Sequence, residues 1–340
     1  MKVLVTGGLG YIGSHTCVEL LQNNYEVIVI DNLSNSEVSV ITRIEKITNK
    51  KITFYKGDLL NKFDIQQVFQ QNEIDAVLHF AASKSVNESV KNPVKYYKNN
   101  ISSMVNLLEV MEDFNVKKFI FSSSAAVYGS TTQQPISELV DTQAMNPYGQ
   151  TKVIGEDFLN DLYISDNEWS IVVLRYFNPI GAHESGLLGE QPNGTPNNLM
   201  PLITQVASKK RRLLYVFGND YNTTDGTGVR DYIHVVDLAK GHVSAVQKLL
   251  LTHGLHTYNL GTGEGYSVLE IINTFEKVNN VNIHYEIVDR RAGDPAVCFA
   301  NPAKAKEELE WSAERTLEDM CRDSWQWEKA LENNILPSRK

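Results

Sequence analysis

The sequence has few cysteines and no long hydrophobic run, and both absences narrow the class of protein. The three cysteines, Cys17, Cys298 and Cys321, are far apart and lack metal-ligand spacing. This sparse, odd set is typical of a reducing cytoplasm rather than of a disulfide framework. No apolar run reaches the length of about 18 residues that a membrane span needs, and no signal peptide precedes the first strand. We therefore predict a cytoplasmic protein with neither a membrane span nor a metal site.

The sequence also lacks an excess of positive charge. Its net charge is −9 at pH 7, which argues against a nucleic-acid-binding surface. A few arginines gathered locally can still bind an anionic ligand. The hydrophobic content of 42% and the charged content of 21% are ordinary for a globular protein. The length of 340 residues allows about two domains, or one large α/β domain with an appendage.

The first half of the chain alternates between short apolar runs and amphipathic segments. The runs are nearly continuous in Val and Ile, as in parallel strands that are buried on both faces. The predicted strands are residues 3–5, 27–30, 52–54, 76–80, 119–121 and 171–174. The predicted helices are residues 12–22, 64–71, 93–114 and 148–163. This alternation predicts a doubly wound, parallel Rossmann sheet over residues 1–177.

The composition and the hydrophobic pattern of the sequence change after residue 177. Residues 178–201 are rich in Gly, Pro and Asn and are interpreted as a loop, and the later elements are shorter and mixed. We predict a smaller, mixed α/β C-terminal domain over residues 178–340. Residues 235–260 have the pattern of a helix and a strand that could instead return to the main sheet.

A glycine-rich turn follows the first predicted strand and opens the first predicted helix. Gly7, Gly10 and Gly13 would let the backbone turn tightly and approach a pyrophosphate at the helix N-terminus. Asp31 ends the next strand, where a carboxylate accepts the adenosine ribose hydroxyls of a dinucleotide. No basic residue follows until Arg43, so the pattern favours NAD over NADP. The alternative for Asp31 is a solvated residue at a strand end.

A second constellation lies in the middle of the chain. Tyr148 and Lys152 are four residues apart, so on a helix they share one face, where an ammonium group favours the phenolate. Ser124 follows the strand predicted at 119–121, at the edge where ligands bind. A Tyr and a Lys at this spacing also occur by chance, Ser124 could be a strand-end hydroxyl, and Lys152 a solvated residue. The ordered set of glycine turn, Ser, Tyr and Lys makes a proton-transfer site the preferred interpretation.

This order of motifs resembles the extended short-chain dehydrogenase/reductase superfamily, and within its sugar-nucleotide branch the 4-epimerases of UDP-glucose and UDP-galactose. The similarity covers essentially the whole chain. It rests on specific runs at residues 7–16, 119–129, 146–152, 174–183, 196–201, 217–235, 258–263 and 290–294.

The resemblance implies an NAD-dependent reaction on a UDP-sugar. Tyr148 would take the proton of the sugar 4-hydroxyl while NAD accepts hydride. The resulting 4-keto sugar would rotate to present its opposite face before hydride returns. Lys152 would bind the nicotinamide ribose and lower the pKa of Tyr148. Ser124 would hydrogen-bond the 4-oxygen. A homodimer is implied as well, and the predicted helices 93–114 and 148–163 could pair with their copies.

The resemblance also implies binding residues along the whole chain. The cofactor positions are Gly7, Gly10, Tyr11, Ile12, Gly13, Asp31, Asn32, Asp58, Leu59, Phe80, Ala81, Lys84, Asn99, Ser122, Tyr148, Lys152 and Phe177. The substrate positions are Lys84, Ser124, Tyr148, Tyr176, Asn178, Asn198, Leu199, Tyr215, Phe217, Arg230, Arg291, Asp294 and Cys298. Among these, Arg230 and Arg291 are expected to bind the UDP pyrophosphate, because a guanidinium matches phosphate geometry.

Two features select among the reactions of this superfamily. Related dehydratases carry an Asp-Glu pair where this chain has Ala125 and Ala126, so elimination of water lacks its acid and base. Cys298 matches a position that varies between a bulky Tyr and a smaller residue. We therefore predict activity on the N-acetylated UDP-hexoses too, unless Cys298 is only a small buried residue or the register slips by one. The remaining alternatives are another NAD-dependent sugar-nucleotide enzyme, either a dehydratase or a net oxidoreductase, and a non-catalytic nucleotide-sensing regulator.

Overall fold

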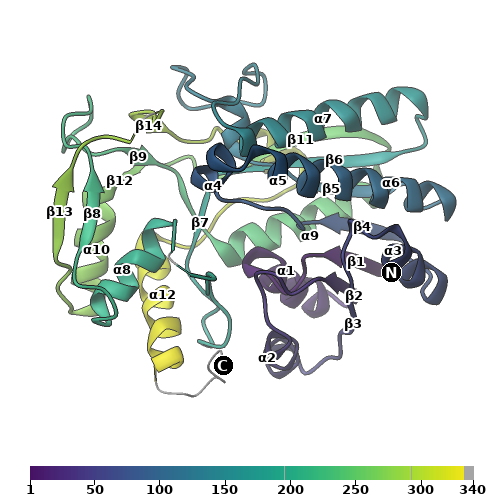
Figure 1. Ribbon diagram of the computed structural model, residues 1–340, viewed down its shortest axis with the longest axis horizontal. Coiled ribbons are helices and arrows are strands. Elements are labelled where there is room, and N and C mark those ends of the chain that lie inside the picture. Colours follow the sequence, from purple (N-terminus) through teal and green to yellow (C-terminus); the bar gives the residue numbers. More distant parts are fainter. Residues whose placement is uncertain (195, 292, 333–340) are drawn as a thin grey trace.

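A seven-stranded parallel sheet organises the computed structural model, which describes residues 1–194, 196–291 and 293–332 (Figure 1). The order of the strands is β11-β6-β5-β4-β1-β2-β3, and every pair is parallel. The strands are β1 (Lys2–Thr6), β2 (Glu26–Asp31), β3 (Thr53–Lys56), β4 (Ala76–His79), β5 (Lys118–Ser122), β6 (Ser170–Tyr176) and β11 (Gly254–Leu260). This arrangement confirms the predicted doubly wound fold.

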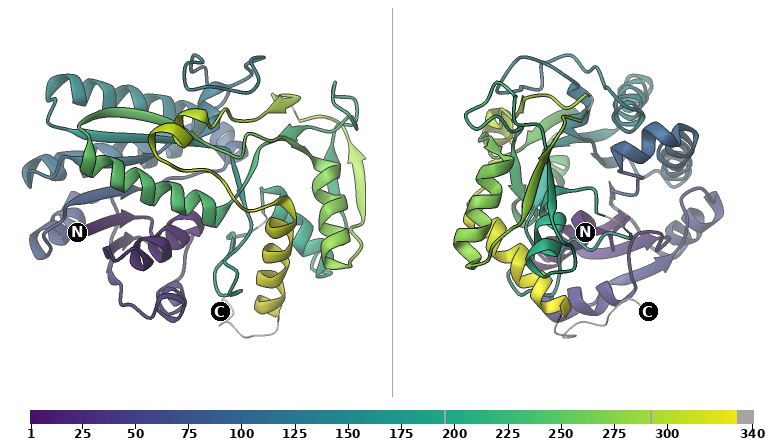
Figure 2. Two further views of the ribbon diagram at one scale, coloured as in Figure 1. Left: turned by 180° about the vertical axis from the view of Figure 1, so that it is seen from behind. Right: turned by 60° about the vertical axis from the view of Figure 1, so that its left-hand side comes forward.

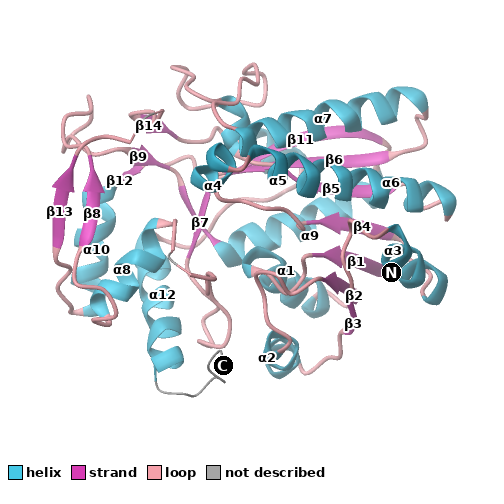
Figure 3. Cartoon of the chain, viewed as in Figure 1, coloured by secondary structure: helices cyan, strands magenta, loops and turns pink. Residues whose placement is uncertain are grey.

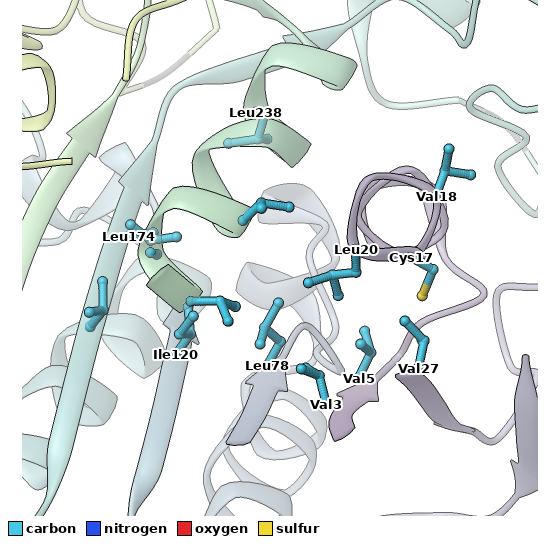
Figure 4. Close-up of a cluster of buried hydrophobic side chains, with 14 of the residues drawn as sticks. Val3, Val5, Cys17, Val18, Leu20, Val27, Leu78, Ile120, Leu174 and Leu238 are labelled. Carbon is cyan, nitrogen blue, oxygen red and sulfur yellow. The ribbon is translucent and has the colours of Figure 1, made fainter. Parts of the chain in front are cut away.

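Helices cover both faces of the sheet, because alternate residues of each central strand point to opposite sides. On one face Val3 and Val5 pack with the helices α1 (Tyr11–Gln22), α2 (Ser39–Thr48) and α9 (Val235–Leu251), as Figure 4 shows for part of this cluster. On the other face Leu4 packs with α3 (Lys62–Gln71), α6 (Ser103–Asp113) and α7 (Pro147–Ser165). The two buried layers fix the strand ends that carry the site.

Two segments differ from the helices that the sequence predicts. The helix expected at 93–114 is instead three consecutive segments, α5 (Pro93–Tyr97), a π-helical turn η1 (Lys98–Ser102) and α6. It is preceded by α4 (Val86–Lys91), and a 3₁₀ turn η2 (Ala125–Tyr128) follows β5. Helix α2 was not predicted.

Among its described residues, the C-terminal part adds three small sheets and, besides α9, four helices (Figures 2 and 3). The sheets pair β7 (Asn178–Ile180) with β10 (Tyr232–His234), β8 (Leu214–Phe217) with β13 (Tyr285–Val288), and β9 (Val229–Arg230) with β12 (Tyr266–Ser267) and β14 (Val297–Cys298). The helices are α8 (Leu199–Ala207), α10 (Val268–Asn279), α11 (Ala303–Glu308) and α12 (Leu317–Glu332).

The interpretation of residues 178–201 as a loop was wrong at its start, because β7 lies there. The sequence also predicts a helix at residues 199–208, and α8 confirms it. Strand β11 pairs with β6 at the edge of the large sheet, and α9 packs against that sheet. The division into two domains at residue 177 stays a prediction. Among the described residues, no helix is long and apolar enough to cross a membrane.

Candidate active site

The turn between β1 and α1 leaves no room for side chains. Gly7 has a φ of +68°, and a Cβ there would lie 2.9 Å from the Ala81 amide nitrogen. A Cβ on Gly13 would lie 2.4 Å from the Gly7 carbonyl oxygen. Gly10 caps α1 without a side-chain hydrogen bond, so the first-turn N–H groups of Tyr11 and Ile12 have no side-chain cap. This bare helix N-terminus suits the pyrophosphate of a dinucleotide.

Asp31 ends β2 beside this turn, and its carboxylate is buried. It accepts hydrogen bonds from the Leu9 amide at 3.1 Å, the Leu33 amide at 2.9 Å and the Ser36 hydroxyl at 2.8 Å. The hydrogen bond from the Leu9 amide ties the carboxylate to the glycine turn, where it would face an adenosine ribose.

The next two cofactor positions lie after β3. Asn32 donates to the Asp58 carboxylate at 3.1 Å, which joins the ends of β2 and β3, and Leu59 is buried behind them. The structure therefore brings these predicted positions to the same sheet edge as Asp31.

Tyr148 and Lys152 lie in the first turns of α7. The Asn146 carboxamide oxygen caps this helix by accepting from the Gly149 amide at 2.9 Å. Lys152 is buried, and its ammonium donates to the Ser122 carbonyl oxygen at 2.6 Å and lies 5.9 Å from the centre of the Tyr148 ring. Burial lowers the pKa of Lys152 to about 8. The cap and the strand end thus set the pair side by side.

The environment of Tyr148 acts on its pKa in opposite directions. Burial raises this pKa, whereas a hydrogen bond with the Ser124 hydroxyl and the positive charge of Lys84 lower it. The net direction is upward. The cation that lowers the pKa of Tyr148 is therefore Lys84, and the similar effect implied for Lys152 stays a prediction.

A polar network that was not predicted from the sequence lies next to this pair. Glu156 lies one turn after Lys152 on α7 and accepts from Arg175 at 2.5 Å and 3.1 Å and from the hydroxyl of Ser123. Arg175 also donates to the Tyr128 hydroxyl at 3.0 Å. The network therefore joins the Ser123 side chain, next to Ser124, to α7 and β6. The spacing of four residues from Lys152 to Glu156 was the available signal.

The predicted contacts of the nicotinamide half follow β4, β5 and β6. The Tyr176 hydroxyl forms a hydrogen bond with Ser122 Oγ. Phe177 is buried in a small apolar cluster with Val127. Phe80 and Ala81 follow β4. Asn99 lies in η1, and its carboxamide donates at 3.0 Å to the Asn100 oxygen, which also accepts from the Ser83 amide in the loop after β4.

The predicted substrate residues occupy the small sheets. An Arg230 guanidinium nitrogen lies 3.4 Å from Asp294 Oδ1, and the Arg291 guanidinium lies 3.9 Å from the centre of the Phe217 ring. Cys298 is partly exposed on β14 and pairs in register with Arg230 on β9. Residue 292, within the predicted run 290–294, is outside the described residues.

The other predicted substrate residues are more scattered. Tyr215 is half exposed on β8, on the face opposite to that of the buried Leu214 and Val216. Asn178 is exposed at the start of β7, while Asn198 and Leu199 begin α8. Within the part of the chain that the structure describes, no group of His, Cys, Asp or Glu side chains is arranged to hold a metal ion.

A parallel sheet that carries a glycine turn and a Ser, Tyr and Lys set at one edge defines a protein of the short-chain dehydrogenase/reductase class. A family model described as GDP-mannose 4,6 dehydratase matches residues 4–324. The chain is 58% identical over 333 residues to the UDP-glucose 4-epimerase of Bacillus subtilis, covering 98% of each chain. The chain belongs to the UDP-glucose 4-epimerase family.

Two solved structures of similar proteins support the same assignment. A UDP-glucose 4-epimerase from Stenotrophomonas maltophila, with bound NAD and formylated UDP-arabinopyranose, superimposes with a TM-score of 0.96 at 50% identity and covers 98% of this chain and 99% of its own. The enzyme from Bifidobacterium longum, in complex with NAD⁺ and UDP, gives 0.95 at 50% identity with the same coverage.

Proposed function

We propose that the chain is an isomerase that interconverts UDP-glucose and UDP-galactose at C4 with bound NAD. The observation that carries this function is the setting of Tyr148, which is half-buried beside Ser124 and Lys152 at the sheet edge that also bears the glycine turn. The similar proteins named above are UDP-glucose 4-epimerases, and two of their structures contain NAD with a UDP-sugar or with UDP.

The residues of the glycine turn fit NAD. Side chains at Gly7 and Gly13 would collide with backbone, so the turn admits a ligand only because both are glycine. The N-terminus of α1 would hold the pyrophosphate, and Asp31 would accept the ribose hydroxyls. When bound, NAD supplies the hydride acceptor and donor for C4 of the sugar.

Tyr148 would act as the base and then as the acid. Its phenolate takes the proton of the sugar 4-hydroxyl. The phenol returns a proton to the 4-oxygen of the 4-keto sugar after this sugar has rotated to present its opposite face. The Ser124 hydroxyl would hydrogen-bond the same oxygen. Lys152, which is held by the Ser122 carbonyl, would orient the cofactor ribose.

The surroundings of Ser124 disfavour the competing elimination reaction. Loss of water from the keto sugar needs a further acid and base, and the residues after Ser124 in η2 are Ala125 and Ala126. The keto sugar would therefore take hydride back, so the reaction has no net redox change.

The UDP group would lie against the small sheets. Arg230 and Arg291 would neutralise the diphosphate, and Asp294, which lies beside Arg230, would bind the uridine ribose. Phe217, whose ring is already covered by Arg291, would contact the uracil. Asn178 and Asn198 would hold the sugar.

Cys298 would admit the N-acetylated UDP-hexoses as additional substrates. Its side chain is small and packs at the edge of the cluster that contains Phe177. We expect the Cys298→Tyr substitution to lower kcat/KM for the N-acetylated pair about 10-fold or more relative to the plain pair, because the larger ring occupies the space of the acetamido group. Unchanged discrimination between the two pairs would remove this assignment.

The protein would act as a homodimer in a reducing compartment. Exposed apolar residues on α4 and α5, Val90, Val94 and Tyr97, lie beside α7 and offer a face for a second copy. All three cysteines are free thiols. Sedimentation equilibrium tests the dimer directly.

The experiment that tests the function is an epimerase assay on the purified protein with all four UDP-sugars. A coupling enzyme that oxidises UDP-glucose reports conversion of UDP-galactose. Without that enzyme, nicotinamide absorbance should stay constant. Net accumulation of reduced nicotinamide would instead indicate an oxidoreductase.

A further inference from the structure

Residues 188–194, here called the strap, join the two halves of the molecule beside the glycine turn. The Asn193 carboxamide donates to the Ser34 carbonyl oxygen at 2.8 Å, in the loop after β2. On the other side, the Trp327 indole of α12 donates to the Glu190 carbonyl oxygen at 3.1 Å. The cleft beside Gly10 and Tyr11 is also lined by strap residues. The strap is therefore anchored to both the cofactor loop and the C-terminal helix.

Glu190 is the carboxylate of this strap, and its side chain is only 9% exposed. One oxygen, Oε1, accepts from the Lys84 ammonium at 2.9 Å and from the Asn198 carboxamide at 2.7 Å. Lys84 comes from the loop between β4 and α4, and Asn198 is the N-cap of α8. One buried oxygen thus connects two residues that the sequence assigns to the ligands.

A buried carboxylate is unexpected at this place. The proposed site takes two diphosphates, and a nearby negative charge opposes the binding of anions. The cost is offset only where the carboxylate is paired, as it is here with Lys84. A carboxylate that is held between Lys84 and Asn198 at such a cost points to a positioning role.

Lys84 needs such a partner, because its side chain is 49% exposed and would otherwise extend into solvent. Its ammonium faces Glu190, the Tyr148 phenol and the Tyr11 ring, whose centre is 6.0 Å away. Tyr148 in turn faces Ser124, Lys84, Lys152 and Tyr176. The charge of Lys84 lowers the pKa of Tyr148. The position of this ammonium therefore affects the base.

We propose that Glu190 is a positioning residue whose carboxylate holds the Lys84 ammonium toward Tyr148 and fastens it to Asn198. The strap would then couple the substrate-binding side of the cleft to the ionisation of the base. This inference rests on the proposed function for its consequence in catalysis, but the coupling itself is a property of the chain.

The test is a titration of Tyr148 that needs no turnover. Near-ultraviolet tyrosinate absorbance is followed against pH for each protein and for the same protein carrying Tyr148→Phe, and the difference isolates Tyr148. In Glu190→Gln the neutral carboxamide can still accept from Asn198 but no longer attracts the Lys84 ammonium with a negative charge. Since Lys84 then moves away, we expect the titration of Tyr148 to shift upward by about one pH unit, which lowers kcat/KM near neutral pH about 10-fold.

Two further variants make the result specific. Lys84→Met should give the same upward shift, and adding Glu190→Gln to it should shift the titration no further, because both changes remove one interaction. Glu45→Gln is the matched control, since Glu45 pairs with the exposed Lys51 at the same distance of 2.9 Å and should leave Tyr148 unaffected.

Three results would overturn the inference: an unchanged titration in Glu190→Gln, a downward shift, or additive shifts in the double variant. A downward shift would mean that Glu190 acts only as a negative charge. If the wild-type protein fails to interconvert UDP-sugars, the proposed function is wrong, yet the titration still decides the role of Glu190.

Discussion

The Glu156→Gln substitution would leave the Arg175 guanidinium buried without its counter-charge. The two side chains are 10% and 11% exposed, and the carboxylate accepts from both Nε and an Nη nitrogen of Arg175. Arg175 also holds the Tyr128 hydroxyl. The substitution keeps the shape of the side chain and removes its charge, so it probes the electrostatic contribution alone.

The magnitude follows from the burial of the pair. Removing one partner of a buried ion pair costs about 3–5 kcal/mol, because the remaining charge is desolvated and uncompensated. For a chain of 340 residues the entropy of unfolding is roughly 0.7 kcal/mol per kelvin. We therefore expect Tm to fall by about 4–7 °C.

Thermal unfolding followed by circular dichroism measures this effect. Glu168→Gln is the control, because Glu168 is 73% exposed and Lys117 keeps Asp166 as a second partner. That control should unfold at the wild-type temperature. A Glu156→Gln protein with the Tm of the control would show that the ion pair of Glu156 and Arg175 does not stabilise the fold.

Two other predictions follow from the glycine turn and from the buried histidines. Gly13→Ala should weaken NAD binding by about 1–3 kcal/mol, because the added Cβ would lie 2.4 Å from the Gly7 carbonyl oxygen. Dialysis followed by quantification of the bound nucleotide measures this loss. Gly228→Ala is the control and should retain NAD, because its Cβ has its nearest contact at 3.4 Å. Burial lowers the pKa of His79 to about 3 and that of His242 to about 4, so the unfolded state binds more protons below its own pKa of 6.5. The free energy of unfolding should therefore fall as the pH falls below 6.5, by up to about 1.4 kcal/mol per pH unit for each histidine. Urea unfolding at several pH values measures this dependence. A free energy of unfolding that stays constant from about pH 6.5 to 4.5 would contradict the prediction.

The large sheet was readable from the sequence because its strands are buried on both faces. Continuous Val and Ile runs identify such strands, and the structure confirms each one in the first half of the chain within a few residues. Helix α2 was missed because Val38 occupies its N-cap without a capping side chain, so the usual start signal is absent. The π turn η1 was not predicted, since a single extra residue in a helical turn leaves no mark that distinguishes it from the α-helices on either side.

The site was predictable where residues follow one another and not where distant segments meet. The pairing of Tyr148 with Lys152 follows from their helical spacing, which a sequence reveals. The hydrogen bond from Lys152 to the Ser122 carbonyl oxygen comes from a distant strand and was not predicted. The contacts of Glu190 with Lys84 and Asn198 depend on how an irregular segment crosses the cleft. No periodicity marks such a segment, so its carboxylate, Glu190, gave no signal.

The most direct test of the central claim is the turnover of Tyr148→Phe in the coupled assay with UDP-galactose. The wild-type protein should form UDP-glucose with no net change in its nicotinamide absorbance. Removal of the hydroxyl should lower kcat by about 10²–10⁴-fold, because the proton of the 4-hydroxyl loses its acceptor. A Tyr148→Phe protein that turns over at the wild-type rate would contradict the assignment of Tyr148 as the base.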